Sequence, residues 1–174
     1  VIPYVVKSLA EARNGDEQPI VFPKDCPRCE KALSRDPGEA VWRCTNIDCP
    51  AQVLERMIHF VSKDAMDIRS FGEANIRKFH EMGVLTDIPS IYRIPFERVR
   101  GLEGFGEKSI SNLSSAIDQS KKQPLHRLIF ALGIRYVGET TAKTLAQAIN
   151  HLNDLGDLSI EQLQQMEDIG VKVA

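Results

Sequence analysis

The sequence lacks any long hydrophobic run and any excess of positive charge. No stretch approaches the roughly 18 consecutive apolar residues that a membrane-spanning helix requires, so we expect no contact with a membrane. The formal net charge is −2, whereas a chain that binds nucleic acid through its overall field is basic. Any contact with nucleic acid must therefore be local. With 174 residues, 43% of them hydrophobic, the chain can bury one moderate core or two small ones.

Cysteine is scarce too, and all four cysteines fall in one short stretch. Two residues separate Cys26 from Cys29, and four separate Cys44 from Cys49. An intervening β-hairpin would bring the two pairs together, so that four thiolates occupy the corners of a tetrahedron. That is the arrangement of a closed structural zinc site. We therefore predict that Cys26, Cys29, Cys44 and Cys49 bind one structural Zn²⁺.

Other interpretations of this stretch compete with a four-thiolate site. A redox role for Cys26 and Cys29 needs a strand before them and a helix after them, whereas Pro23 and Pro27 favour turns. Two disulfides need an oxidising compartment, and no signal peptide is visible. His59 could replace a thiolate as ligand. It is more simply a solvated helix residue, since four thiolates already fill a tetrahedral site.

The segments around the cysteines predict a strand, a linker, a hairpin and a helix. Residues 1–6 are rich in β-branched side chains and resemble the last strand of a domain, and the polar cluster at 14–19 marks a linker. Residues 36–38 predict a turn, with 40–43 as one arm of a short hairpin. Pro50 suits the first position of a helix. The apolar stripe of that helix consists of Val53, Leu54, Met57, Ile58 and Val61.

From residue 64 onward, a glycine recurs at a nearly constant interval. Gly72, Gly106, Gly138 and Gly170 are 34, 32 and 32 residues apart. Apolar residues occupy the same places around each glycine: one, four and seven residues before it, and four and, where the chain extends that far, seven after it. These positions share one helical face on each side of a turn. The pattern predicts four tandem units of helix, tight turn and helix, the last one truncated.

The second unit shows what such a turn can bind. Gly104 and Gly106 permit positive φ and leave bare N–H groups at the start of the next helix, where the helix dipole favours an anion. Lys108 adds a charge beside them, and Ser109 adds a hydroxyl. A duplex phosphate fits this environment, and backbone amides read no bases. A side chain at Gly106 is expected to strain the turn and to block the phosphate.

The four turns are unequal. Where the second has Gly104, the others have Ser70, Tyr136 and Asp168. Asp168 would repel a phosphate, which makes the fourth turn the doubtful one. Each cation near a turn is as readily interpreted as a solvated surface residue. The predicted DNA-binding residues are Gly72, Gly104, Gly106, Lys108, Ser109, Arg135, Gly138, Thr140, Thr141 and Lys143.

A protein-binding solenoid is the alternative explanation of the repeat. Superhelical helix pairs also recur every 33 to 34 residues, on the order of the spacing found here. The signature residues of tetratricopeptide and ankyrin repeats are absent from the sequence. The repeat instead follows the helix-hairpin-helix pattern, in which an apolar residue and a glycine precede a second apolar residue, a glycine and a helix.

Several motifs together resemble a known family. They are the segment at 1–5, Cys26-Pro27-x-Cys29, the segment Arg43-Cys44-Thr45-Asn46 followed by Cys49-Pro50-Ala51-Gln52, and the segments at 104–109 and 131–142. They resemble the carboxyl half of bacterial NAD-dependent DNA ligases, and the resemblance covers essentially the whole chain.

The resemblance implies a mainly α fold, with a four-cysteine zinc finger ahead of four helix-hairpin-helix units. It places the end of an oligonucleotide-binding barrel and a linker at 1–19, with a residual β-strand. The zinc finger then occupies 20–50, a connecting helix 51–63 and the helix-hairpin-helix domain 64–174. Cys26, Cys29, Cys44 and Cys49 match the family's zinc ligands.

The resemblance also implies a function. The parent enzyme seals nicks in duplex DNA during replication and repair, using NAD⁺ and Mg²⁺, and we expect it to be a cytoplasmic monomer. No K-x-D-G adenylation motif occurs in the chain, so no catalytic residue is predicted here. The chain would hold the duplex for adenylation and barrel domains outside these residues. The alternative is a non-catalytic helix-hairpin-helix module of a repair protein.

Overall fold

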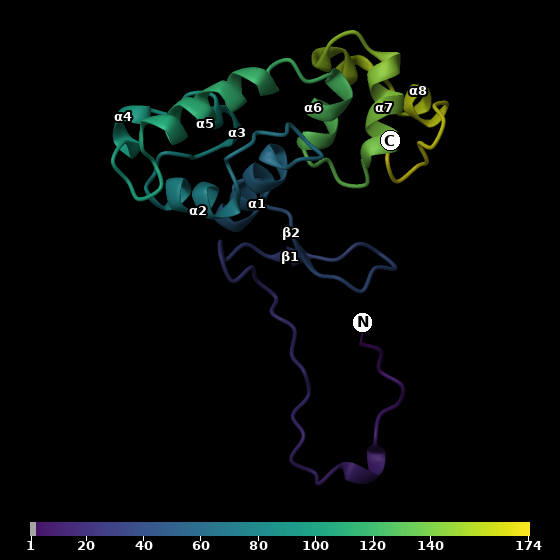
Figure 1. Cartoon of the computed structure of the whole chain (residues 1–174). Helices are drawn as coiled ribbons and strands as arrows, with labels where there is room; N and C mark the ends of the chain where they lie inside the picture. Colours follow the sequence, from purple (N-terminus) through teal and green to yellow (C-terminus); the bar gives the residue numbers. More distant parts are fainter. Residues whose placement is uncertain (1–2) are drawn as a thin grey trace. The chain divides into compact units, whose positions relative to one another are not determined.

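The computed structural model describes residues 3–174 of the chain (Figure 1). Two compact units can be distinguished, Val1–Asn46 and Ile47–Ala174. The first holds little regular structure, and the second is helical.

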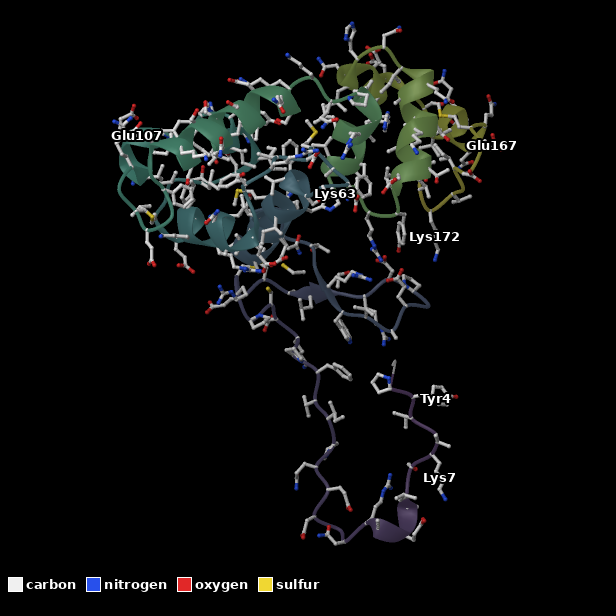
Figure 2. The ribbon with its side chains drawn as sticks, in the orientation of Figure 1. Tyr4, Lys7, Lys63, Glu107, Glu167 and Lys172 are labelled. Carbon is white, nitrogen blue, oxygen red and sulfur yellow. The ribbon has the colours of Figure 1, made fainter. Side chains whose placement is uncertain are left out.

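The predicted strand at the start of the chain is not found among the described residues. Residues 3–9 form no strand, and a short 3-10 helix follows at Ala10–Ala12. The side chains at positions 4–6 are at least 84% exposed, and Figure 2 shows Tyr4 and Lys7 along this segment. Residues 1–2 lie outside the described part. A β-branched run forms a strand only when a neighbouring strand pairs with its backbone, and none pairs with residues 3–9 in the described structure.

The cysteine stretch contains the expected hairpin in a shorter form. Strands β1 (Leu33–Ser34) and β2 (Arg43–Cys44) pair antiparallel, with Leu33 opposite Cys44. The turn lies where it was predicted: the Glu39 N–H donates to the Asp36 carbonyl at 3.0 Å, and Gly38 has φ +85°. Of the predicted arm 40–43, only the last residue belongs to a strand.

Helix α1 (Pro50–Val61) begins at the predicted proline, with Cys49 as its N-cap. Its predicted stripe faces inward: Met57 and Val61 are buried, and the other three members are partly buried against the same core. Phe60 is buried with them. A burial of this kind is the main source of stability for an amphipathic helix.

The helical unit contains two hydrophobic cores. The first core lies among α1, α2 (Glu73–Glu81), α3 (Ile88–Ile91), α4 (Phe96–Val99) and α5 (Glu107–Ser120). Aromatic rings pack at tilted angles within it, with the centroids of Phe71 and Phe79 at 5.4 Å and those of Phe79 and Phe105 at 4.9 Å.

The second core lies among α6 (Leu125–Ala131), α7 (Glu139–Ala148), the 3-10 segment Leu152–Asp157 and α8 (Ile160–Gln164). Helix α6 belongs to both cores, because Ala131 is buried in the first and Ile129 in the second. Figure 1 shows α6 between the first group of helices and α7.

The spacing of apolar residues around the repeat glycines, which we call the glycine register, predicts most of the buried side chains. The residues directly before the four glycines are at most 8% exposed, as are those four and seven places after the first three. Ile134 departs from the pattern and is 41% exposed. The buried members are Phe71, Phe105, Val137 and Ile169 before the glycines, and Ile76, Phe79, Ile110, Leu113, Ala142 and Leu145 after them.

The helices before the turns are shorter than the pattern predicted. Residues 64–68 form no helix, and α4, α6 and α8 have 4, 7 and 5 residues. Pro95 and Pro124 stand directly before α4 and α6, and a proline excludes the residue before it from helical geometry. After Gly170, residues 171–174 form a turn rather than a helix, so the number of four units stays a prediction.

Within residues 3–174, every helix is too short or too polar to cross a bilayer.

Candidate functional site

The four cysteines form a compact cluster of sulfur atoms. Their Sγ atoms all lie within 4.8 Å of one another, and those of Cys29 and Cys44 are 3.5 Å apart. A tetrahedron with Zn–S bonds of about 2.3 Å has sulfur atoms about 3.8 Å apart, whereas a disulfide requires about 2.05 Å. None of the four cysteines is in a disulfide. The cluster therefore fits Zn²⁺ and does not fit two disulfides.

Local backbone geometry places the first cysteine pair. The Cys26 N–H donates to the Lys31 carbonyl at 2.8 Å, and the Glu30 N–H donates to the Cys26 carbonyl at 2.8 Å. Glu30 has φ +60°, which turns the chain back toward the hairpin. Pro27 and its neighbours thus form a tight turn rather than the strand and helix that a redox pair requires.

The thiols of Cys29 and Cys44 differ in pKa. Hydrogen bonds from the Asn46 side chain and from the Lys31 backbone lower the pKa of Cys29 to about 6. At Cys44, a backbone hydrogen bond from Asn46 lowers the pKa, but burial and the thiols of Cys29 and Cys26 outweigh it and raise the pKa to about 12. The first thiolate opposes the formation of the next, and a bound dication would relieve that repulsion.

Zinc binding should therefore release protons at neutral pH. With a pKa of about 12, Cys44 keeps its proton at pH 7 until the metal displaces it. We expect at least about one proton per Zn²⁺, and an affinity that rises with pH, because only the thiolate binds metal. Calorimetric titration of the metal-free chain in buffers of different ionisation enthalpy measures both. Stoichiometric binding with no proton release at pH 7 would contradict a four-thiolate site.

The repeat turns share one backbone conformation. Two residues before each repeat glycine, φ is positive: +63° at Ser70, +83° at Gly104, +67° at Tyr136 and +62° at Asp168. Glycine adopts this conformation without strain, whereas the other three residues do so at a cost. The turn geometry thus recurs even where the glycine does not.

The repeat glycines themselves are not at positive φ, and this corrects the expectation for Gly106. Gly72, Gly106 and Gly138 have φ of −73°, −78° and −85° and extended ψ, and they are the N-caps of α2, α5 and α7. None has a neighbouring atom within 4 Å of where a Cβ would stand. A side chain at Gly106 therefore meets no strain and no clash within the chain.

Glycine N-caps leave the helix amino termini open. No side chain caps α2, α5 or α7, so a side-chain oxygen does not occupy their first N–H groups. An anion is the natural partner of such groups.

The first residue of each of these helices is a glutamate, whose negative charge interacts favourably with the helix dipole at the amino terminus. Two of these glutamates form salt bridges with arginines: Arg77 pairs with Glu73 at 2.7 Å, and Arg100 pairs with Glu107 at 3.4 Å. Figure 2 labels Glu107 at the start of α5.

Most of the predicted DNA-binding side chains are accessible. Lys108, Arg135, Thr140 and Lys143 are exposed and Ser109 is half-buried, while Thr141 is buried. Thr141 stands three residues after Gly138, within α7.

Two basic residues near the turns were missed by the sequence analysis. Lys78 lies beside the second turn, with its Nζ 3.5 Å from the Glu103 carbonyl and 6.0 Å from the Phe105 ring centroid. Arg100 stands next to the same turn through its pair with Glu107. Neither residue occupies a position that recurs as a basic residue in the other units, so the spacing of the repeat did not indicate that they lie near the turn.

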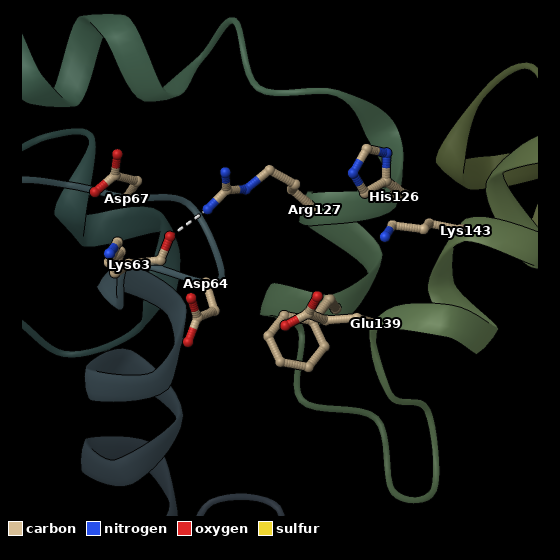
Figure 3. Close-up of a pocket in the computed structure, with 8 residues that line it drawn as sticks. Lys63, Asp64, Asp67, His126, Arg127, Glu139 and Lys143 are labelled. Carbon is tan, nitrogen blue, oxygen red and sulfur yellow. Dashed lines mark hydrogen bonds between the residues drawn. The ribbon is translucent and has the colours of Figure 1, made fainter.

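The third turn has its own arrangement of charge. The Arg135 guanidinium lies 4.6 Å from the Tyr136 ring centroid, which fixes the cation beside the turn. A pocket of about 330 Å³ borders the start of α7 (Figure 3). Its lining combines cations and carboxylates: Lys63, Asp64, Asp67, His126, Arg127, Phe130, Glu139 and Lys143.

His59 is not the solvated helix residue that was expected. Its ring meets Phe130 edge-on with centroids 4.9 Å apart, and its Nε2 lies 2.9 Å from the Phe130 carbonyl oxygen. At His59, therefore, α6 lies against the face of α1 opposite the stripe, which sequence periodicity could not reveal. His59 also does not belong to the cysteine cluster.

A four-thiolate zinc site and open helix amino termini at glycine turns define a class: a zinc-containing, helix-hairpin-helix segment. Comparison with known families agrees. Residues 25–51 match the NAD-dependent DNA ligase C4 zinc finger domain, and residues 127–174 match the helix-hairpin-helix motif.

Similar proteins are bacterial DNA ligases. The chain is 59% identical to the DNA ligase of Persephonella marina, 58% to that of Sulfurihydrogenibium azorense and 49% to that of Aquifex aeolicus. Each match covers 100% of this chain and 24%, 25% and 24% of the relative. The chain therefore resembles a segment of bacterial DNA ligases and carries the zinc finger domain of the NAD-dependent ones, and it spans about a quarter of the length of these relatives.

Proposed function

We propose that this chain holds nicked duplex DNA for a bacterial NAD-dependent DNA ligase, and that it binds the phosphate backbone without reading bases. The observation that most supports this is the set of turns whose glycine N-caps leave the amino termini of α2, α5 and α7 uncapped. Phosphates bind readily at such termini. The second turn is the strongest site, because Gly104, Gly106 and exposed Lys108 occur together there.

The whole enzyme would seal a 3′-hydroxyl to a 5′-phosphate in replication and repair. By resemblance, NAD⁺ would transfer AMP to a lysine with release of nicotinamide mononucleotide, AMP would pass from that lysine to the 5′-phosphate, and the 3′-hydroxyl would displace AMP. Mg²⁺ would neutralise phosphate charge. The lysine motif K-x-D-G does not occur in these 174 residues. In this division of labour the chain supplies binding, and the adenylation and barrel domains of the enzyme act on the bound nick.

The proposed domain limits are 1–19 for the barrel end and linker, 20–50 for the zinc finger, 51–63 for the connecting helix and 64–174 for four helix-hairpin-helix units. Zinc stabilises the finger, whose two-residue strands offer little core of their own. We propose a monomer that acts in the cytoplasm, where a bacterial chromosome lies and thiols stay reduced.

A binding experiment tests this function directly. Fluorescence anisotropy should show that the chain binds a nicked duplex, with equal affinity for duplexes of scrambled sequence. Removing one cation that neutralises a phosphate should reduce the salt slope by about 0.9, and a chain of net charge −2 should show a shallow slope. We expect Lys108→Ala to lower that slope by about one such step.

Lys121→Ala is the matched control. Lys121 is also exposed, but it stands at the end of α5 and pairs with Asp118 at 2.7 Å. Its replacement should leave the salt slope unchanged. A wild-type chain that contains zinc yet fails to bind any duplex would contradict the proposal and favour the protein-binding solenoid.

A further inference from the structure

Helix α6 and the residues just before it make three polar contacts with α1 and the turn that follows it. His59 on α1 meets the Phe130 carbonyl, and the Gln123 side-chain amide donates to the Met66 carbonyl at 3.4 Å. The third contact is made by Arg127, near the middle of α6. These contacts cross 57 to 71 residues of sequence.

Arg127 makes the most constrained of these contacts. Its Nε donates to the Ala65 carbonyl at 2.6 Å, and its Nη2 donates to the Lys63 carbonyl (Figure 3). The side chain is half-buried, at the edge of the pocket beside the third turn. A planar guanidinium can donate to two carbonyls at once in a fixed geometry, which a lysine ammonium cannot reproduce.

The two carbonyls belong to the segment that leads into the first repeat turn. Ala65 stands seven residues before Gly72 and is fully buried in the first core. Arg127 stands on the helix that leads into the third turn at Gly138. A single side chain therefore links the approach to the first turn with the approach to the third.

We propose that Arg127 is a positioning residue that fixes the spacing between the first pair of turns, at Gly72 and Gly106, and the third turn at Gly138. Its importance for DNA rests on the proposed function. Two binding sites held at a matching spacing engage one duplex together, and such linkage raises affinity by factors on the order of 10² to 10⁴. We call the contact between α6 and the segment after α1 the joint. If the joint is loosened, part of the gain in affinity is lost even when each turn is intact.

The joint itself can be measured without DNA. Spin labels on unnatural amino acids at exposed Glu81 in α2 and Gln147 in α7 leave the cysteines untouched. Their distance distribution should be narrow in the wild type and broad in Arg127→Met. Arg127→Lys should also broaden it, because lysine keeps the charge but cannot donate to both carbonyls in the fixed geometry of a guanidinium.

Arg98→Met is the matched control. The Arg98 Nη2 donates to the Met82 carbonyl at 3.3 Å, which joins two elements of the first core only. This variant should leave the distance distribution narrow. Circular dichroism should show unchanged helix content in all three variants.

DNA affinity supplies the second readout. Lengthening a duplex from roughly one helical turn to two and a half, about 10 to 25 base pairs, should raise wild-type affinity more than that of Arg127→Met. We expect the gain to shrink about tenfold in Arg127→Met and Arg127→Lys and to persist in Arg98→Met. A general loss of stability would instead lower the affinity for both duplexes alike.

The outcomes separate the two proposals. An unchanged distance distribution in Arg127→Met overturns the positioning role, whatever the DNA results. A broadened distribution with an undiminished gain from duplex length overturns its consequence for DNA binding. If the wild type binds neither duplex, the proposed function is wrong, and the distance measurement alone decides whether Arg127 fixes the joint.

Discussion

Replacing Cys44 by serine is expected to unfold the zinc finger while leaving the helices folded. The first unit has strands of only two residues, and the zinc bond supplies free energy on the order of 10 kcal/mol that its core cannot replace. The helical unit Ile47–Ala174 has two apolar cores of its own. Elemental analysis should find no zinc, and hydrogen exchange should show rapid exchange near residues 24–46.

The ellipticity at the helix minimum should change little in that variant. Thr45→Ser, at the exposed neighbouring position, is the control and should keep both zinc and slow exchange. If Cys44→Ser instead loses most of its helical signal, the helices depend on the metal, and the independence inferred from the two cores is wrong.

Gly106→Val is expected to abolish most binding by the second turn without unfolding the protein. Gly106 has φ −78° and open space beside it, so valine fits the chain. The same side chain would occupy the space that a phosphate needs to reach the α5 amides. Losing charge-assisted hydrogen bonds of about 1.5–3 kcal/mol corresponds to a loss of roughly tenfold or more in affinity. Lys108→Ala, which removes one charge, should cost less.

Two glycines serve as controls for that experiment. Gly156→Val adds a side chain at an equally open position outside the turns and should leave DNA affinity unchanged. Gly104→Val should lower thermal stability, because Gly104 has φ +83°. Unchanged affinity of a folded Gly106→Val chain for nicked duplex would show that the turn serves packing rather than phosphate binding.

Spacing alone was enough to predict the cluster of four cysteines and most of the helical core. Four cysteines in one stretch have few ways to pair, and a glycine register repeated at nearly constant intervals imposes the same inward positions each time. Positive φ was expected only at glycines, and its occurrence at Tyr136 and Asp168, which match Gly104 in the repeat, was not predicted.

The features that sequence missed depend on partners far along the chain. Residues 3–6 have β propensity, but propensity does not supply a neighbouring strand. His59 and Arg127 look like solvated helix residues until α6 and the turn after α1 come together. Thr141 was assigned to DNA by its hydroxyl, although the residue is buried.

The sharing of α6 between the two cores bears on how the helical unit unfolds. Neither core can lose α6 without exposing apolar surface of the other, since Ala131 is buried in one and Ile129 in the other. Two separable subdomains would melt in two steps with distinct midpoints. Because the helix is shared, unfolding of one core destabilises the other. The 47–174 unit should therefore melt in one cooperative transition, with a calorimetric enthalpy equal to its van't Hoff enthalpy.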